Sequence, residues 1–305
     1  NPFTKSIHGA ENVETPSTTT RYVIPNLNEL HITHTNLTAI SSFDFDGYNA
    51  LQHLHLMQNH LQRIASYAFK KLNNLLTLDI SINELDRLPK ECLHGLVQLK
   101  RLNLSSNVLR TLDEFTAELS YLESLDISYN RLEHIDRNVF QNLYGLRELR
   151  LAANRIATLS IESFRSLNSL TTLDLRENVF NQIPLDVFDL LETHLQTLQV
   201  EHNPYNCSCE SQILWDWIKD HQKIMQSSER FIKCESPSSL RGRPFGTVTP
   251  EEFCPLITEV TVNDVQQYSL AISWQHREHT GLSGFEIFYQ AIDGGVDDVS
   301  SIDCC

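Results

Sequence analysis

Hydrophobic residues recur through most of the chain in one pattern, LxxLxLxxNxLxxI, whose complete copies follow one another every 23 or 24 residues. The eight copies begin at Leu27, Leu51, Leu75, Leu99, Leu122, Leu146, Leu170 and Leu195, and the last is incomplete. The LxL segment alternates apolar and polar side chains, which predicts a short strand that buries every second residue. Leu54 and Leu56 should point inward, whereas His53, His55 and Met57 should point outward. A single copy would expose its apolar face, so we expect the copies to stack into a solenoid.

A second apolar column lies near position 19 of the copies and should fill the far side of the coil. Phenylalanine occupies it at Phe45, Phe69, Phe140, Phe164 and Phe188. Cys92-Leu93 and Phe115 stand near this position in the third and fourth copies, where the pattern is looser.

The pattern resembles the leucine-rich repeat over residues 27 to about 203. The resemblance implies an α/β solenoid, a horseshoe with a parallel sheet on its concave side. It also implies that one asparagine per coil is buried and hydrogen-bonds the backbone between coils. These asparagines are Asn59, Asn83, Asn107, Asn130, Asn154, Asn178 and Asn203. Because a buried amide without partners costs about 1–3 kcal/mol, we interpret the column as structural. Thr35 replaces the asparagine in the first copy, which suits an edge coil.

Four cysteines follow the repeats, beginning in the segment NPYNCSCESQILWDWIKDHQKI. Four cysteines allow three pairings, and a CxC with two distant cysteines is also a zinc spacing. Residues 204–254 resemble the cysteine-rich C-terminal flanking cap of extracellular leucine-rich-repeat proteins. The resemblance implies the disulfides Cys207–Cys234 and Cys209–Cys254, and disulfides indicate an extracellular location. Ile213, Leu214, Trp217 and Ile218 are spaced to form the apolar face of a short helix.

The N-terminal end, residues 1–26, differs from the family because no cysteine precedes Cys92. TTTRYVIPNLNEL resembles the closing half of an N-terminal flanking cap, and residues 1–20 are typical of a polar lead-in. The first coil should therefore be covered by residues near Tyr22–Ile24, by a partner, or by a second copy in a homodimer. Cys92 is expected to be a buried, unpaired thiol, and an intermolecular bridge is the alternative.

Residues 255–305 have a different character. Alternating runs at Ile257–Val262, Leu270–Trp274 and Phe285–Tyr289 predict three strands. SLAISW followed by GFEIFYQ resembles strands B and C of a fibronectin type III domain, which implies that Trp274 is its core tryptophan. Only about half of such a domain is present, and the pattern suggests no role for Cys304 and Cys305.

Charge and motifs exclude several functions. The formal net charge of −15 disfavours nucleic acid, whose phosphates bind to lysine and arginine. The chain has no apolar run long enough to span a membrane and no signal peptide in its first residues. It also has no GxSxG, HExxH or glycine-rich phosphate loop, so we predict a binding protein without enzymatic activity, cofactor or metal.

The outward strand positions should form the binding face. Tyrosine and arginine are enriched at interface hot spots, and six candidates gather toward the C-terminal flank: Tyr129, Arg131, Arg150, Arg155, Arg176 and Glu177. Two glycosylation sequons stand at Asn36 and Asn103, and Asn103 falls at mid-face. A glycan there would direct a partner to one flank, an edge or the convex side.

Histidines gather in the first two copies, at His31, His34, His53, His55 and His60. The simplest interpretation is that these histidines are solvated surface residues. A pH-sensitive contact is one alternative, and zinc held by His31 and His55 with Glu29 or Asp79 is another.

The order of repeats, cap and fibronectin-like segment resembles animal cell-surface adhesion and wiring receptors. This resemblance implies protein ectodomains as partners, often of the immunoglobulin superfamily. An innate-immune pattern receptor and a matrix structural protein are the alternatives.

Overall fold

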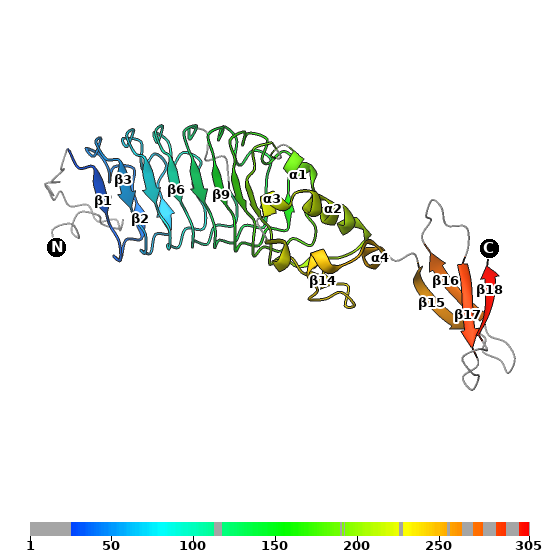
Figure 1. Ribbon diagram of the computed structural model, residues 1–305. Coiled ribbons are helices and arrows are strands. Elements are labelled where there is room, and N and C mark those ends of the chain that lie inside the picture. The colour runs from blue at the N-terminus through cyan, green and yellow to red at the C-terminus, as the bar shows by residue number, and fades with distance from the viewer. Residues whose placement is uncertain are drawn as a thin grey trace. The chain divides into compact units, whose positions relative to one another are not determined.

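The computed structural model describes residues 26–112, 118–189, 191, 193–225, 228–254, 257–263, 271–276, 285–290 and 299–304 (Figure 1). The predictions for Phe115, the residues near Tyr22–Ile24, the lead-in and Cys305 lie outside these ranges. The chain divides into two compact units, residues 1–248 and 249–305, whereas the sequence placed the last boundary after residue 254.

The first unit is a stack of coils whose strands form one parallel eight-stranded sheet (Figure 1). The strands are β1 (Glu29–His31), β3 (His53–His55), β5 (Thr77–Asp79), β6 (Arg101–Asn103), β7 (Ser124–Asp126), β9 (Glu148–Arg150), β11 (Thr172–Asp174) and β12 (Thr197–Gln199). Their order in the sheet follows the chain, so each coil pairs only with its neighbours. Leu54 and Leu56 are fully buried. The parallel solenoid sheet predicted from the repeat is confirmed.

The far side of the coils is filled by the predicted apolar column. All five of its phenylalanines are buried, and the rings of Phe45 and Phe69 stack with centroids 5.6 Å apart. Cys92 and Leu93 fill the same layer in the third coil, and Cys92 is a free, fully buried thiol as predicted. Burial raises the pKa of Cys92 to about 12.

Short strands that the repeat pattern did not predict follow the asparagine turns. β2 (Ala39–Ile40) pairs with β4 (Arg63–Ile64), and β8 (His134–Ile135) pairs with β10 (Thr158–Leu159). One helical turn, α1 (Asp186–Asp189), follows β11.

The asparagine column forms a ladder of hydrogen bonds between coils. Asn83 accepts at Oδ1 from the Leu61 N–H at 3.0 Å, and its Nδ2 donates to the carbonyls of Leu56 and Ile80, each at 3.0 Å. The same three kinds of bond recur from Asn59 to Asn203. In the first coil, the N–H and hydroxyl of Thr35 both donate to Asn59 Oδ1. Each buried amide is therefore satisfied on both sides.

A left-handed residue stands directly before the ladder position of every coil. The eight are His34, Gln58, Ile82, Ser106, Tyr129, Ala153, Glu177 and His202, with φ between 52° and 59°. This conformation costs roughly 1–2 kcal/mol for a non-glycine residue. It directs the N–H toward the next coil, so that Ser106 N donates to the Ser128 carbonyl and Tyr129 N to the Ala152 carbonyl, each at 2.9 Å.

The solenoid ends in a helical cap. β13 (Tyr205–Asn206) pairs with β14 (Cys234–Ser236), and Cys207 and Cys234 form a disulfide with Cα atoms 5.6 Å apart. Cys209 and Cys254 are also disulfide-bonded, and their pairing with each other stays a prediction. The other described helices of the first unit are the 3-10 turns Cys209–Ser211, Ser228–Phe231 and Phe245–Thr247, with α2 (Gln212–Asp220) and α3 (Gln222–Met225), whereas α4 (Pro250–Phe253) belongs to the second unit.

The buried face of α2 differs from the predicted one. Leu214, Trp215 and Ile218 are buried, whereas Ile213 is 66% exposed and Trp217 is only partly buried. The Trp215 indole N–H donates to the Phe245 carbonyl at 3.1 Å, a long-range bond that helical spacing could not indicate.

The second unit contains two antiparallel hairpins. β15 (Ile257–Asn263) pairs with β16 (Ala271–His276), and β17 (Phe285–Gln290) pairs with β18 (Val299–Cys304). The first three strands match the predicted ones within a few residues. β18 was not predicted, and it places Cys304 in a strand.

Candidate recognition surface

The outward strand residues form two straight columns. In register, Glu29 faces His53, and this column continues through Thr77, Arg101, Ser124, Glu148, Thr172 and Thr197. The second column contains His31, His55, Asp79, Asn103, Asp126, Arg150, Asp174 and Gln199. This is the arrangement that the repeat pattern predicted.

Half of the second column has a local structural role. Oδ1 of Asp79, Asn103, Asp126 and Asp174 accepts a hydrogen bond from the N–H two residues later, at 2.9 to 3.1 Å. An aspartate or asparagine that bonds its own backbone in this way closes a turn, here at the end of the strand. The repeat pattern predicts a binding face from all outward strand positions together, because a turn-forming side chain and a ligand-binding one look alike in a repeat.

Two of the six predicted binding residues lie near the sheet and are held by carboxylates. Arg150 pairs with Glu148 at 2.5 Å and lies 3.7 Å from Asp126. Arg176 donates from Nε and Nη2 to the two carboxylate oxygens of Asp174, at 2.9 and 2.8 Å. Their positive charge is largely neutralised within the protein.

The other four lie on the turns that follow the strands, which we call the turn edge: Tyr129, Arg131, Arg155 and Glu177. Tyr129 is 60% exposed, and it and Glu177 are left-handed residues beside the ladder. Arg131 and Arg155 come directly after the ladder asparagines of adjacent coils and are exposed. Neither arginine has an ion-pair partner in the described part of the chain. The structure therefore separates the predicted patch into a neutralised pair and an accessible edge.

One buried charge near Arg176 was not predicted. Glu201 is 5% exposed, its Oε1 lies 3.9 Å from Arg176 Nε, and its Oε2 has no hydrogen-bond partner. Burial raises the pKa of Glu201, and the Arg176 charge offsets only part of that effect. The equivalent positions of three earlier coils carry Ser81, Ser128 and Ala152, which are also buried, so these small residues are the signal that could have identified this position.

The two sequons lie in different places. Asn36 is exposed on a turn of the first coil, and Asn103 is half-buried on β6 in the sheet. Because Asn103 uses Oδ1 for its turn bond, Nδ2, the atom that would carry a glycan, is left without a partner among the described residues.

The histidines separate into two places. His31 and His55 stack with ring centroids 4.4 Å apart and an interplanar angle of 9°. His31 Nε2 lies 2.8 Å and His55 Nε2 3.7 Å from Glu29 Oε1. The hydrogen bond from His31 lowers the pKa of Glu29, and burial followed by the charge of His31 lowers the pKa of His55. His60 lies elsewhere and pairs with Glu84 at 2.8 Å.

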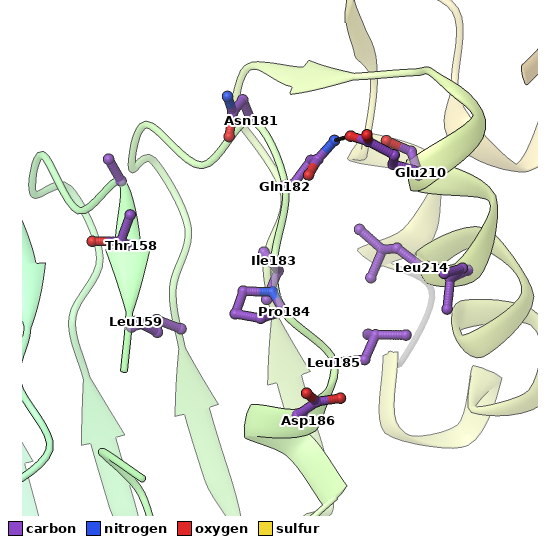
Figure 2. Close-up of a pocket in the computed structure, with 13 residues that line it drawn as sticks. Thr158, Leu159, Asn181, Gln182, Ile183, Pro184, Leu185, Asp186, Glu210 and Leu214 are labelled. Carbon is purple, nitrogen blue, oxygen red and sulfur yellow. Dashed lines mark hydrogen bonds between the residues drawn. The ribbon is translucent and has the colours of Figure 1, made fainter. Parts of the chain in front are cut away.

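A hollow of about 440 Å³ lies between the last coils and the cap (Figure 2). Leu159, Ile183 and Leu185 line it from the coils and Leu214 lines it from α2, while Gln182 donates to Glu210 at 2.7 Å. Apolar and polar side chains line it in nearly equal numbers, and it contains none of the residues predicted to bind a partner.

The leucine-rich repeat model matches residues 49–109, 109–156 and 144–204, which together cover just over half of the chain. The chain therefore belongs to the leucine-rich repeat proteins.

Similarity to particular proteins is local. The mouse SLIT and NTRK-like protein 5 is 36% identical over 86 residues, which cover 28% of this chain and 9% of that protein. Human Toll-like receptor 4 is 31% identical over 81 residues, 27% of this chain and 10% of the receptor. The chain thus spans about a tenth of the length of the curated relatives that it matches.

Solved structures share the fold over a larger part of the chain. Human 5T4, the trophoblast glycoprotein, has a TM-score of 0.67 at 22% identity, covering 75% of this chain and 88% of that one. A chain of the octameric latrophilin 3, Unc5D and FLRT2 complex has a TM-score of 0.59 at 22% identity, covering 74% and 76%. Toll-like receptor TLR13, solved with single-stranded RNA, has a TM-score of 0.57 at 28% identity, covering 60% of this chain and 26% of the receptor. No helix in the described part of the chain is long and apolar enough to cross a membrane.

Proposed function

We propose that this chain is an extracellular recognition protein, secreted or displayed on a cell surface, whose solenoid binds the ectodomain of another protein. The disulfide between Cys207 and Cys234 supports the location, because such bonds persist in oxidising compartments. Binding requires neither a cofactor nor a catalytic step.

The turn edge is the part of the solenoid that we assign to the partner. Its two arginines carry charge that no carboxylate of the described chain neutralises, and Tyr129, two residues before Arg131, is exposed. Tyrosine and arginine supply a large share of the binding energy at protein interfaces. Arg150 and Arg176 support this edge from the sheet and carry less of the binding, because each already has an acidic partner.

A glycan at Asn103 would strengthen this assignment. It would occupy the middle of the sheet face and leave the turn edge open to a protein. Mass spectrometry of glycopeptides from secreted material, with Asn103→Gln and Asn36→Gln as controls, tests whether each sequon is used.

The partner class that we favour is an ectodomain of the immunoglobulin superfamily, in an adhesion or neuronal wiring role. The FLRT2 leucine-rich repeats were solved together with immunoglobulin domains of Unc5D, which makes such domains the first candidates to test. An innate-immune receptor is the second candidate, supported by the local match to Toll-like receptor 4. A matrix structural role is the third. We disfavour RNA, although TLR13 binds it, because the net charge of −15 opposes binding to phosphates.

A binding screen separates these candidates. The full chain is tested by surface plasmon resonance against an ectodomain library, a bacterial glycan panel and single-stranded RNA. We expect a hit among ectodomains. Sedimentation of the chain alone tests the homodimer that the cysteine-free N-terminal end suggests.

A charge reversal on the turn edge then tests the surface. Arg155→Glu should weaken the ectodomain hit by about 30-fold, the size of a 2 kcal/mol hot spot. Arg63→Glu makes the same charge change at an exposed residue of β4 and should leave the affinity unchanged. Arg150→Glu is a poorer test, because the new glutamate would face Glu148 and Asp126. Equal effects of Arg155→Glu and Arg63→Glu would contradict the turn-edge assignment.

We also propose that residues 255–305 are the first part of a fibronectin type III-like sandwich. Val260 lies opposite Trp274, and Val262 opposite Ile272, so these apolar residues share one face of the β15–β16 hairpin. Val260 and Val262 are 60% and 57% exposed. An apolar face of this kind is what the second sheet of a sandwich covers.

A further inference from the structure

The second outward column changes character at the first two coils. Its turn-forming positions carry aspartate or asparagine, which bond their own backbone. His31 and His55 make no such bond in the described structure, and their imidazoles project from the sheet. The N-terminal end of the face is thus chemically distinct from its middle.

Three metal-ligating side chains converge there. Glu29 and His31 are two residues apart on β1 and share one face, and His55 is the direct partner of His31 on β3. One ligand atom from each of the three lies within 4.8 Å of the other two. The backbone fixes this convergence, because in-register parallel strands hold successive side chains about 4.8 Å apart.

We propose that Glu29, His31 and His55 form a binding site for one Zn²⁺ ion on the N-terminal end of the sheet. Two imidazoles and one carboxylate are a ligand set suited to zinc, with water or a partner side chain in the fourth position.

Completing the site requires a rotation of the His31 ring, because the stacked imidazoles of His31 and His55 are nearly parallel and their in-plane nitrogen lone pairs do not meet at one point. Zinc bonds of about 2.0–2.1 Å place tetrahedral ligand atoms about 3.3 Å apart. His31 Nε2 is 2.8 Å from Glu29 Oε1 and must move away by about 0.5 Å, and His55 Nε2 must approach from 3.7 Å. The ion takes the place of the proton that His31 shares with the carboxylate. The side chains of His31 and Glu29 are more than half exposed, so they can rotate without disturbing the core.

The chain contains a matched control for this arrangement. His60 Nδ1 lies 2.8 Å from Glu84 Oε1 on the coil turns, which is the same histidine–glutamate contact without a second imidazole. If exposed histidine–glutamate pairs alone bound zinc, this pair would do so as well.

Calorimetric titration of the full chain with Zn²⁺ after chelator treatment tests the proposal. Cys304 and Cys305 are replaced by serine in every sample, because thiolates also bind zinc. We expect one ion per chain, and affinity losses of about 10- to 100-fold or more for His31→Ala and for His55→Ala, at least as large as losing an outer-sphere partner costs. His60→Ala should leave the affinity unchanged.

A second measurement reports where the ion binds. Because the three ligands join β1 to β3, Zn²⁺ should slow amide hydrogen exchange in β1 and leave exchange in β9 unchanged. Absence of zinc binding, binding that survives His31→Ala and His55→Ala, or equal loss in His60→Ala would overturn the proposal.

Discussion

Buried polar residues that follow the strands of this repeat differ in whether their hydrogen bonds are complete. The seven ladder asparagines and the buried Glu201 all follow strands of the same sheet, but the asparagines have a full set of partners and Glu201 does not. A buried polar group is stabilising only when its hydrogen bonds are complete. Burial of Glu201 therefore costs folding free energy, which the other contacts of the coil offset.

Glu201→Gln tests this cost through its pH dependence. Because burial raises the pKa of Glu201 in the folded state, this group favours folding at low pH, and that contribution is lost as pH rises through the folded pKa. At pH 7, above the pKa of an unfolded glutamate, this raised pKa lowers the free energy of unfolding, so the amide should raise stability. The gain should disappear below about pH 4, where the carboxyl is protonated in both states. Urea unfolding at several pH values measures it, with the exposed Glu133→Gln as a control that shows no gain. A gain independent of pH would contradict the explanation.

At the scale of elements, the coil turns are set by hydrogen bonding between coils more than by local preference. Eight residues of varied type, among them the β-branched Ile82, adopt positive φ at the same place. Such a residue would avoid this conformation in isolation. The inter-coil N–H···O bond and the ladder asparagine next to it hold the backbone there.

Substitutions at Ser106 measure this conformational cost. Ser106→Val introduces a β-branched side chain at φ 56° and should lower the free energy of unfolding by about 1–2 kcal/mol. Ser106→Asn, which tolerates this region, should have little effect. Thermal and urea unfolding compare the two variants. A valine variant as stable as the asparagine variant would show that the turn imposes no such strain.

At the scale of the whole molecule, the chain is two compact units, and among the residues whose burial is described, nearly all buried apolar side chains lie in the solenoid and its cap. The β15–β16 hairpin exposes apolar residues, and an isolated two-stranded hairpin is only marginally stable in water. The solenoid and its cap should therefore not depend on the hairpins.

Removal of residues 255–305 tests this independence. The cut after Cys254 retains all four cysteines of the cap. We expect the main thermal transition to shift by less than about 4 °C, the shift that corresponds to about 1 kcal/mol in a chain of this size. Differential scanning calorimetry measures it. A large drop, with the cap disulfides intact by mass spectrometry, would show that the hairpins support the solenoid.

Much of the fold follows from the sequence because the repeat is periodic. The strand positions, inward leucines, phenylalanine layer and buried asparagines all come from one spacing that is copied eight times. The buried face of α2 was predicted wrongly at Ile213, because the Trp215 contact with Phe245 joins residues 30 positions apart. β18 was missed because its run VSSIDC carries little hydrophobic alternation.

The sequence by itself determined the solenoid, its ladder and the candidate surface residues, since each depends on a period along the chain. Only the tertiary structure decided which of those residues are available. Carboxylates two residues earlier in the same coil, Glu148 and Asp174, pair with Arg150 and Arg176, whereas Arg131 and Arg155 on the turn edge have no ion-pair partner among the described residues. Strand register joined His31 and His55, which are 24 residues apart, beside Glu29. Proximity across coils depends on how the chain stacks, and for that reason no single repeat could reveal it.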